Sequence, residues 1–230
     1  MPEPLVLLHG FGGTHRAWDQ VLEHLPPERY RPVARPDLPG HGGVPAGAEV
    51  SLGVDEPAVL CGYSMGGRLA LEIALDRPGA VTRLILVSAT AGIEGDAARA
   101  ERRAADEQLA RDLEHMPAEA FADRWQAQPI FDGTPADAAR VWRQDLLRSD
   151  PPQLAAALRR FGQGVLPARW HQLSGLSIPV TVVVGERDGR YRLIADRLCA
   201  ALPDATLHVI PGAGHGLPRE APAALAAAIG

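Results

Sequence analysis

An α/β fold with a mostly parallel sheet, covered by helices on both faces, is predicted by two features of the sequence. Short apolar runs alternate with segments of helical periodicity, and glycine-rich turns follow several of those runs. A strand of a parallel sheet is buried on both faces, so it is almost continuously apolar rather than alternating. The predicted strands are residues 5–8, 31–34, 58–61, 84–87, 180–184 and 207–210.

Helical patterns follow most of these strands and also fill a long central segment. The helices expected against the sheet are residues 14–25, 68–76, 191–201 and 218–229. From about 91 to 170 the sequence is rich in Ala, Arg and Glu and shows helical periods but no strand pattern. We therefore expect a single domain over residues 1–230, in which a helical cap at about 91–170 covers the sheet edge where ligands bind.

The connection over residues 43–57 does not fit the alternation. A crossover between parallel strands takes a dozen residues or more and usually carries a helix. This segment contains three glycines and two prolines and has no amphipathic period. Two interpretations remain open at this point: the crossover is a loop, or a helix has been lost from it.

Composition and charge restrict the function classes. The 230 residues are 46% hydrophobic and 22% charged, as in a globular protein, and no apolar run reaches the roughly 18 residues of a membrane span. The net charge of −5 argues against a general binder of nucleic acids or anionic membranes. Cys61 and Cys199 make no disulfide framework, and the first residues lack the basic region of a signal peptide, so we expect a cytoplasmic protein.

Residues 62–66, Gly-Tyr-Ser-Met-Gly, form a G-x-S-x-G pattern between a predicted strand and a predicted helix. That context is typical of a nucleophile elbow, a sharp turn that exposes a serine at the N-terminus of a helix. Backbone N–H groups and the helix dipole favour negative charge there. Ser64 is therefore the candidate nucleophile or base. The alternative interpretation is a glycine-rich turn with an incidental serine.

An activated serine needs a base, and the base needs an acid that orients it. His215 lies between two glycines just after the last predicted strand, and Asp188 follows the fifth. Serine, acid and histidine in this chain order are one of the known arrangements of such triads. Glu186 is a competing acid, but the strand-to-helix position favours Asp188. The alternative for both residues is a solvated loop position.

A developing negative charge on the substrate needs two further hydrogen-bond donors. We expect them to be the backbone N–H of Met65, directly after the serine, and that of Phe11, in the turn after the first strand. His9 is expected to be structural. The eight histidines are dispersed without carboxylates at ligand spacing, so no metal is expected. Gly10-x-Gly12 lacks the rest of a dinucleotide-binding motif, and no cofactor is expected either.

Arg68 lies one helical turn after Ser64, on the same face of the predicted helix. A cation near a helix N-terminus is electrostatically disfavoured, so this guanidinium needs a partner. That partner is either a carboxylate within the fold or an anionic ligand. All 23 basic residues of the chain are arginines, which makes any single arginine weak evidence for recognition of an anion.

Four motifs, which together span nearly the whole chain, resemble those of the α/β-hydrolase superfamily. They are LLHGF at 7–11, DLPGHG at 37–42, GYSMGGR at 62–68 and GAGH at 212–215. Other stretches resemble, within that superfamily, the 2-succinyl-6-hydroxy-2,4-cyclohexadiene-1-carboxylate synthases, lyases that eliminate pyruvate from a succinyl-enolpyruvyl cyclohexene precursor in menaquinone biosynthesis. These stretches are ERRAAD at 101–106, WQAQPIF at 125–131, LRS at 147–149 and GERDGRY at 185–191.

The resemblance implies roles for individual residues. Ser64, Asp188 and His215 match the catalytic triad, in which the serine acts as a base that removes a ring proton. The residues that match substrate-binding positions are Tyr63, Arg68, Arg102 (or its neighbour Arg103), Trp125 and Arg148. The implied partner is a small anionic molecule with several carboxylates, and several cations are what such a substrate requires.

Two other functions are compatible with the same sequence. A carboxylesterase or C–C bond hydrolase would use the same triad with Ser64 as a covalent nucleophile. A non-catalytic binding module is the third hypothesis, although the intact triad argues against it. The chain also departs from the family in three places: no strand precedes residue 5, the crossover at 43–57 lacks a helix, and Gly189-Arg190-Tyr191 replaces a pattern that usually carries Lys and Phe.

Overall fold

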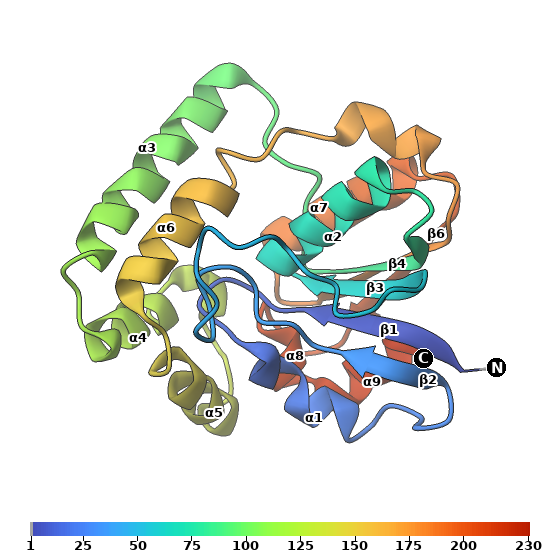
Figure 1. Cartoon of the computed structure of the whole chain (residues 1–230), viewed down its shortest axis with the longest axis horizontal. Helices are drawn as coiled ribbons and strands as arrows, with labels where there is room; N and C mark the ends of the chain where they lie inside the picture. Colours follow the sequence, from blue (N-terminus) through green and yellow to red (C-terminus); the bar gives the residue numbers. More distant parts are fainter. Residues whose placement is uncertain (1) are drawn as a thin grey trace.

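The computed structural model describes residues 2–230 and contains one six-stranded sheet (Figure 1). The sheet order is β2-β1-β3-β4-β5-β6, and every neighbouring pair is parallel. Each strand lies where the sequence predicts it, one to three residues longer, so the parallel α/β prediction is confirmed. The strands are β1 (Glu3–Leu8), β2 (Tyr30–Ala34), β3 (Ala58–Tyr63), β4 (Val81–Val87), β5 (Val180–Gly185) and β6 (Ala205–Ile210).

Burial explains why the central strands have almost continuously apolar sequences. All six residues of β3 and all six of β5 are buried, because these strands have neighbours on both sides and helices on both faces. The edge strands β2 and β6 carry exposed residues instead. The two faces of β1 point into different cores, since Val6 and Leu8 pack in one apolar cluster and Leu5 and Leu7 in the other.

Each face of the sheet is covered by its own set of helices (Figure 1). The first core contains residues of α2 (Met65–Asp76) and α7 (Gly189–Ala201). The second contains residues of a 3₁₀ turn, η1 (His15–Trp18), together with α1 (Asp19–Leu22), α8 (Leu217–Glu220) and α9 (Pro222–Ile229). No helix within residues 2–230 is both long enough and apolar enough to cross a membrane.

Two of the predicted helices are divided in the structure. The segment predicted as a helix over 14–25 is the 3₁₀ turn η1 followed by the short α1, and Thr14 caps the turn by accepting the Arg16 N–H at 3.2 Å. The segment 218–229 is divided between α8 and α9 at Ala221, which has φ −145° and ψ 56°. The following Pro222 disfavours a helical conformation at the preceding residue, so the chain bends there.

The crossover at 43–57 is a loop without helix or strand. It is held against α6 (Pro151–Phe161) by three hydrogen bonds. The Ala46 N–H donates to Gln153 Oε1 at 2.9 Å, and Arg160 Nη1 donates to the carbonyls of Ala46 and Ala48 at 2.7 and 2.6 Å. Because a neighbouring helix satisfies the backbone of this loop, it needs no helix of its own.

Four helices follow β4 where the sequence predicts a cap, and they gather beyond one end of the strands (Figure 1). They pack around an apolar cluster of their own that includes Phe121, Trp142, Leu146 and Leu154. The chain then returns to β5 through a 3₁₀ turn, η3 (Trp170–Gly175). The cap helices are α3 (Asp96–Leu113), α4 (Ala118–Gln126), α5 (Ala136–Leu146) and α6, with a 3₁₀ turn, η2 (Pro129–Phe131), between α4 and α5.

A buried ion pair joins the cap to the sheet domain, by which we mean the sheet together with the helices that cover its two faces. Arg219, in α8, donates from Nη2 to Asp145 Oδ2, in α5, at 2.6 Å, and both side chains are at most 7% exposed. Asp145 also accepts the backbone N–H of Thr14 at 3.1 Å and its hydroxyl proton through Oδ1. The carboxylate is thus fully compensated, as a buried charge must be.

Asp145→Ala should lower the free energy of unfolding by about 3 to 5 kcal/mol, because it leaves the Arg219 guanidinium buried without its counter-charge. Urea denaturation of both proteins measures the change. Asp123→Ala is the matched control: Asp123 also pairs with an arginine, Arg143, but its side chain is 70% exposed, so its loss should cost less than about 1 kcal/mol. Equal effects of the two substitutions would contradict the assigned role of Asp145.

Candidate active site

Ser64 forms the turn between β3 and α2, with φ 53° and ψ −110°. A positive φ is unfavourable for a residue with a side chain, so the surrounding contacts must hold the turn. Two glycines allow those contacts. A Cβ at Gly62 would lie 2.3 Å from the carbonyl oxygen of Gly66, and a Cβ at Gly66 would lie 2.3 Å from that of Leu8. The first turn of α2 therefore packs directly on the ends of β1 and β3.

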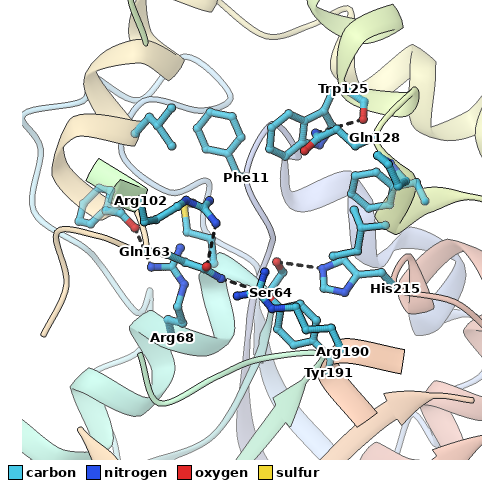
Figure 2. Close-up of a pocket in the computed structure, with 17 residues that line it drawn as sticks. Phe11, Ser64, Arg68, Arg102, Trp125, Gln128, Gln163, Arg190, Tyr191 and His215 are labelled. Atoms are coloured by element: carbon cyan, nitrogen blue, oxygen red, sulfur yellow. Dashed lines mark hydrogen bonds between the residues drawn. The ribbon is translucent and has the colours of Figure 1, made fainter. Parts of the chain in front are cut away.

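The structure brings Ser64, His215 and Asp188 together from three separate turns of the chain, and Figure 2 shows the first two of them facing each other. Ser64 Oγ lies 3.2 Å from His215 Nε2, and His215 Nδ1 lies 2.6 Å from Asp188 Oδ2. With the proton on Nδ1 donated to the buried Asp188 carboxylate, Nε2 is free to accept the serine proton. Glu186, the competing acid, is exposed and accepts the N–H of Gly212 at 2.7 Å instead.

Two backbone N–H groups are available beside Ser64. Within residues 2–230, neither Met65 at the start of α2 nor Phe11 after β1 donates its N–H to a protein acceptor. The turn that holds Phe11 is fixed by the buried His9: Nδ1 donates to the Gly10 carbonyl at 2.8 Å, and Nε2 accepts the Leu38 N–H at 2.9 Å. Burial lowers the pKa of His9 to about 4, so the ring is neutral and can accept that bond.

A cavity of about 240 Å³ opens above Ser64 and lies between the sheet domain and the cap (Figure 2). The sheet domain contributes Ser64, His215, the loop after β1 and the first turn of α7, and the cap covers them with aromatic and polar side chains. The lining residues are Phe11, Ser64, Met65, Arg68, Arg102, Trp125, Gln128, Pro129, Ile130, Phe131, Leu158, Phe161, Gly162, Gln163, Arg190, Tyr191 and His215.

Arg68 is a buried cation in the wall of this cavity. Its residue is 9% exposed, and its one hydrogen bond runs from Nη1 to the carbonyl oxygen of Phe161 at 2.9 Å. Among residues 2–230 no carboxylate pairs with it. Burial lowers its pKa to about 10, which still leaves it charged at neutral pH. Of the two partners considered for Arg68, a carboxylate within the fold is therefore excluded for the described residues.

Arg102 is the cap arginine that reaches the cavity. Its Nη1 donates to Gln163 Oε1 at 2.9 Å (Figure 2), and its Nε donates to Asp106 Oδ1 at 2.7 Å. Gln163 in turn donates to the Tyr191 hydroxyl at 2.9 Å, which links the cap to the first turn of α7. Arg103 points elsewhere and donates to the Gly164 carbonyl at 3.3 Å. The structure thus separates two neighbours that the sequence left equivalent.

Three other sequence-predicted residues take different positions. Trp125, in α4, lines the cavity and lies 4.9 Å from Phe11 between ring centroids. Tyr63 is buried behind Ser64, where it lines a smaller cavity of about 30 Å³ together with Arg219. Arg148 does not join the main cavity. It is exposed just after α5 and lines a surface groove together with Arg16, so the structure does not bring it to Ser64 with Arg68, Arg102 and Trp125.

Sequence reasoning missed Gln163 and Arg190 as lining residues. Arg190 is exposed at the cavity and has no ion-pair or hydrogen-bond partner within residues 2–230. Its position two residues after Asp188 could have indicated it, because α7 begins directly after the candidate acid and must start near the site. No sequence signal indicated Gln163, which reaches the cavity only because the end of α6 packs over α2. No group of His, Cys, Asp and Glu in the described residues could hold a metal ion.

Comparison of the chain with known proteins agrees with the geometry of this site. The model of the alpha/beta hydrolase family matches residues 5–228. The chain belongs to the alpha/beta hydrolase family. It is 34% identical over 235 residues to the 2-succinyl-6-hydroxy-2,4-cyclohexadiene-1-carboxylate synthase of Salmonella paratyphi A, covering 95% of this chain and 89% of that protein.

Solved structures show the same family relationship. MenH from S. aureus superposes with a TM-score of 0.88 at 29% identity, over 98% of this chain and 91% of the other. A thermophilic esterase from Thermogutta terrifontis, described with malate bound, has a TM-score of 0.77 at 28% identity, over 100% and 88%. The expected α/β-hydrolase fold is therefore confirmed.

His41 packs against Phe11, in the loop after β1. Its ring packs edge-on against Phe11 at 5.6 Å and lies 5.0 Å from the ring of His9, and its Nδ1 donates to the Pro39 carbonyl at 3.1 Å. Burial, together with the neighbouring His9, lowers its pKa to about 3. The folded protein therefore holds His41 neutral, whereas the unfolded chain protonates it near pH 6.5.

This difference predicts a pH dependence of stability. The free energy of unfolding should fall by about 2 kcal/mol more between pH 7 and pH 5 in the wild type than in His41→Gln, because only the wild-type unfolded chain gains that proton. Urea denaturation at the two pH values measures this. The His9 contribution is common to both proteins, so equal losses would mean that His41 is not held neutral.

Proposed function

We propose that this protein is a 2-succinyl-6-hydroxy-2,4-cyclohexadiene-1-carboxylate synthase, a cytoplasmic lyase that eliminates pyruvate from a succinyl-enolpyruvyl-hydroxycyclohexene-carboxylate. The observation that carries the proposal is the un-neutralised, buried Arg68 in the wall of a cavity that also contains Ser64 and His215. The relatives of this name at 34% identity over most of the chain support it.

The charges of the cavity suit a substrate with several carboxylates. Arg68, Arg102 and the exposed Arg190 all line the cavity. The carboxylate next to Arg102, that of Asp106, is already paired with Arg102. A guanidinium in a dry site binds a carboxylate through charge-assisted hydrogen bonds that water competes with poorly. The aromatic rings of Phe11 and Trp125 provide an apolar surface for a six-membered ring.

The proposed reaction begins with removal of a ring proton made acidic by the succinyl carbonyl. Ser64 Oγ takes that proton as its own hydroxyl proton passes to His215 Nε2, which Asp188 stabilises through Nδ1. Charge that develops on the carbonyl oxygen is stabilised by the N–H groups of Phe11 and Met65. The ring C–O bond then breaks, and the departing enolate takes up a proton to become pyruvate.

Hydrolysis is the second candidate function. It is favoured by the same serine–histidine contact with two free N–H donors, which suits attack on an ester carbonyl, and by the esterase at 28% identity. The two functions are separated by products. Release of pyruvate from the precursor without appreciable turnover of p-nitrophenyl acetate supports the lyase, whereas rapid ester hydrolysis without pyruvate supports the hydrolase.

Ser64→Ala should lower the rate of pyruvate release by roughly 10²- to 10⁴-fold, because the group that removes the ring proton is lost. Single-turnover measurement of pyruvate separates this step from product release. Circular dichroism of the variant checks that the fold is retained, which we expect since an alanine fits the same space. A near-normal rate would remove Ser64 from the mechanism.

Arg68→Gln should weaken productive binding of the substrate by about 1.5 to 3 kcal/mol, measured from kcat/KM for pyruvate release, because a charge-assisted hydrogen bond is lost. The matched control is Arg140→Gln. Arg140 is an exposed arginine of α5 that does not line the cavity, and its loss should leave kcat/KM unchanged. Similar values for both variants would refute the role of Arg68.

A further inference from the structure

The loop that carries His215 is held by a buried carboxylate that the proposed reaction does not use. Glu220, the last residue of α8, turns back toward this loop, and its side chain is 2% exposed. Its Oε2 accepts the N–H of Gly214 at 2.7 Å, and its Oε1 accepts the N–H of Gly216 at 3.0 Å. The two oxygens therefore hold the backbone on both sides of His215.

The same carboxylate also contacts the loop of the catalytic acid and the cap. Arg187, directly before Asp188, donates to Glu220 Oε2 at 2.9 Å, and Thr134, in the cap, donates to Oε1 at 3.3 Å. Arg187 also donates to the carbonyls of Asp132, Gly133 and Gly212, which fixes its position. Four donors around one buried carboxylate compensate its loss of water.

The glycines beside His215 are explained by this contact. A Cβ at Gly214 would lie 3.1 Å from both carboxylate oxygens, and a Cβ at Gly216 would lie 2.9 Å from Oε1. The absence of side chains at both positions therefore makes room for the Glu220 carboxylate. An imidazole fixed at its backbone has little freedom left, because its Nδ1 is already bonded to Asp188 at 2.6 Å.

We propose that Glu220 is a positioning residue, which aligns His215 Nε2 with Ser64 Oγ by fixing the backbone on both sides of the histidine. The inference rests on the Ser64–His215 pair of the proposed function, but it does not depend on which substrate the pair acts on. Glutamine at this position has a single carbonyl oxygen, so it satisfies one of the two glycine N–H groups and presents an amide donor to the other.

The experiment compares Glu220→Gln with Glu186→Gln. Glu186 is the matched control, because its carboxylate accepts the N–H of Gly212 on the same loop, farther from His215. The first readout is the rate at which a neutral organophosphorus fluoride labels Ser64, which needs activation by His215 but no substrate-binding cation. The second is the low-field proton resonance of the His215–Asp188 hydrogen bond, and the third is kcat and KM for pyruvate release.

We expect Glu220→Gln to label Ser64 on the order of 10²-fold more slowly than the wild type, as a misplacement near 1 Å would cause. Its low-field resonance should broaden or shift, and kcat should fall while KM stays the same. Glu186→Gln should match the wild type in all three. Wild-type labelling and an unchanged resonance in folded Glu220→Gln would overturn the proposal, as would equal losses in the two variants.

Two further arms keep the result interpretable. If Glu220→Gln does not fold, Gly216→Ala takes its place: the φ of −77° at Gly216 suits alanine, and the added Cβ displaces the carboxylate without removing it. It should slow labelling in the same way, and a normal rate would overturn the proposal. If the wild type releases no pyruvate, the proposed function fails, while the labelling rate and the resonance still decide the role of Glu220.

Discussion

The close approach of α2 to the ends of β1 and β3 is the constraint on which the site depends. Without side chains at Gly62 and Gly66 the helix can begin against the sheet, and Ser64 takes the positive φ that this turn requires. The contact places three groups on one helical turn: the Ser64 hydroxyl, the Met65 N–H and the Arg68 guanidinium. Their relative positions follow from α-helix geometry once the turn is formed.

Arg68 differs from the other buried charged side chains in that no group of opposite charge compensates it among the described residues. Within the described residues, Asp145 forms an ion pair with Arg219 and Asp106 forms one with Arg102. The Glu220 carboxylate accepts hydrogen bonds from several donors. Arg68 has only a carbonyl oxygen. An uncompensated charge in a protein interior is expensive, so it is tolerated where a ligand of opposite sign completes it. The cost of desolvating this guanidinium is thus the physical basis for the anionic substrate that we propose.

The cap forms part of the site, because contacts at several separate places fix it to the sheet domain. Asp145 pairs with Arg219, Arg160 holds the crossover loop, and Thr134 contacts the carboxylate beside the His215 loop. These contacts place Trp125 and Arg102 over Ser64. They also mean that the position of the cap and the alignment of His215 depend on one hydrogen-bond network, through Arg187 and Glu220.

The sequence by itself determined the strand pattern, the elbow around Ser64 and the residues expected to act with it. Those features depend on local rules, since apolar runs, turn glycines and motif order are visible along the chain. Only the tertiary structure decided between Arg102 and Arg103, moved Arg148 out of the cavity and brought in Gln163. The physical reason is that the direction of a side chain in the cap depends on how the cap segments pack, as α3 does against α6, and these contacts join residues far apart in the sequence.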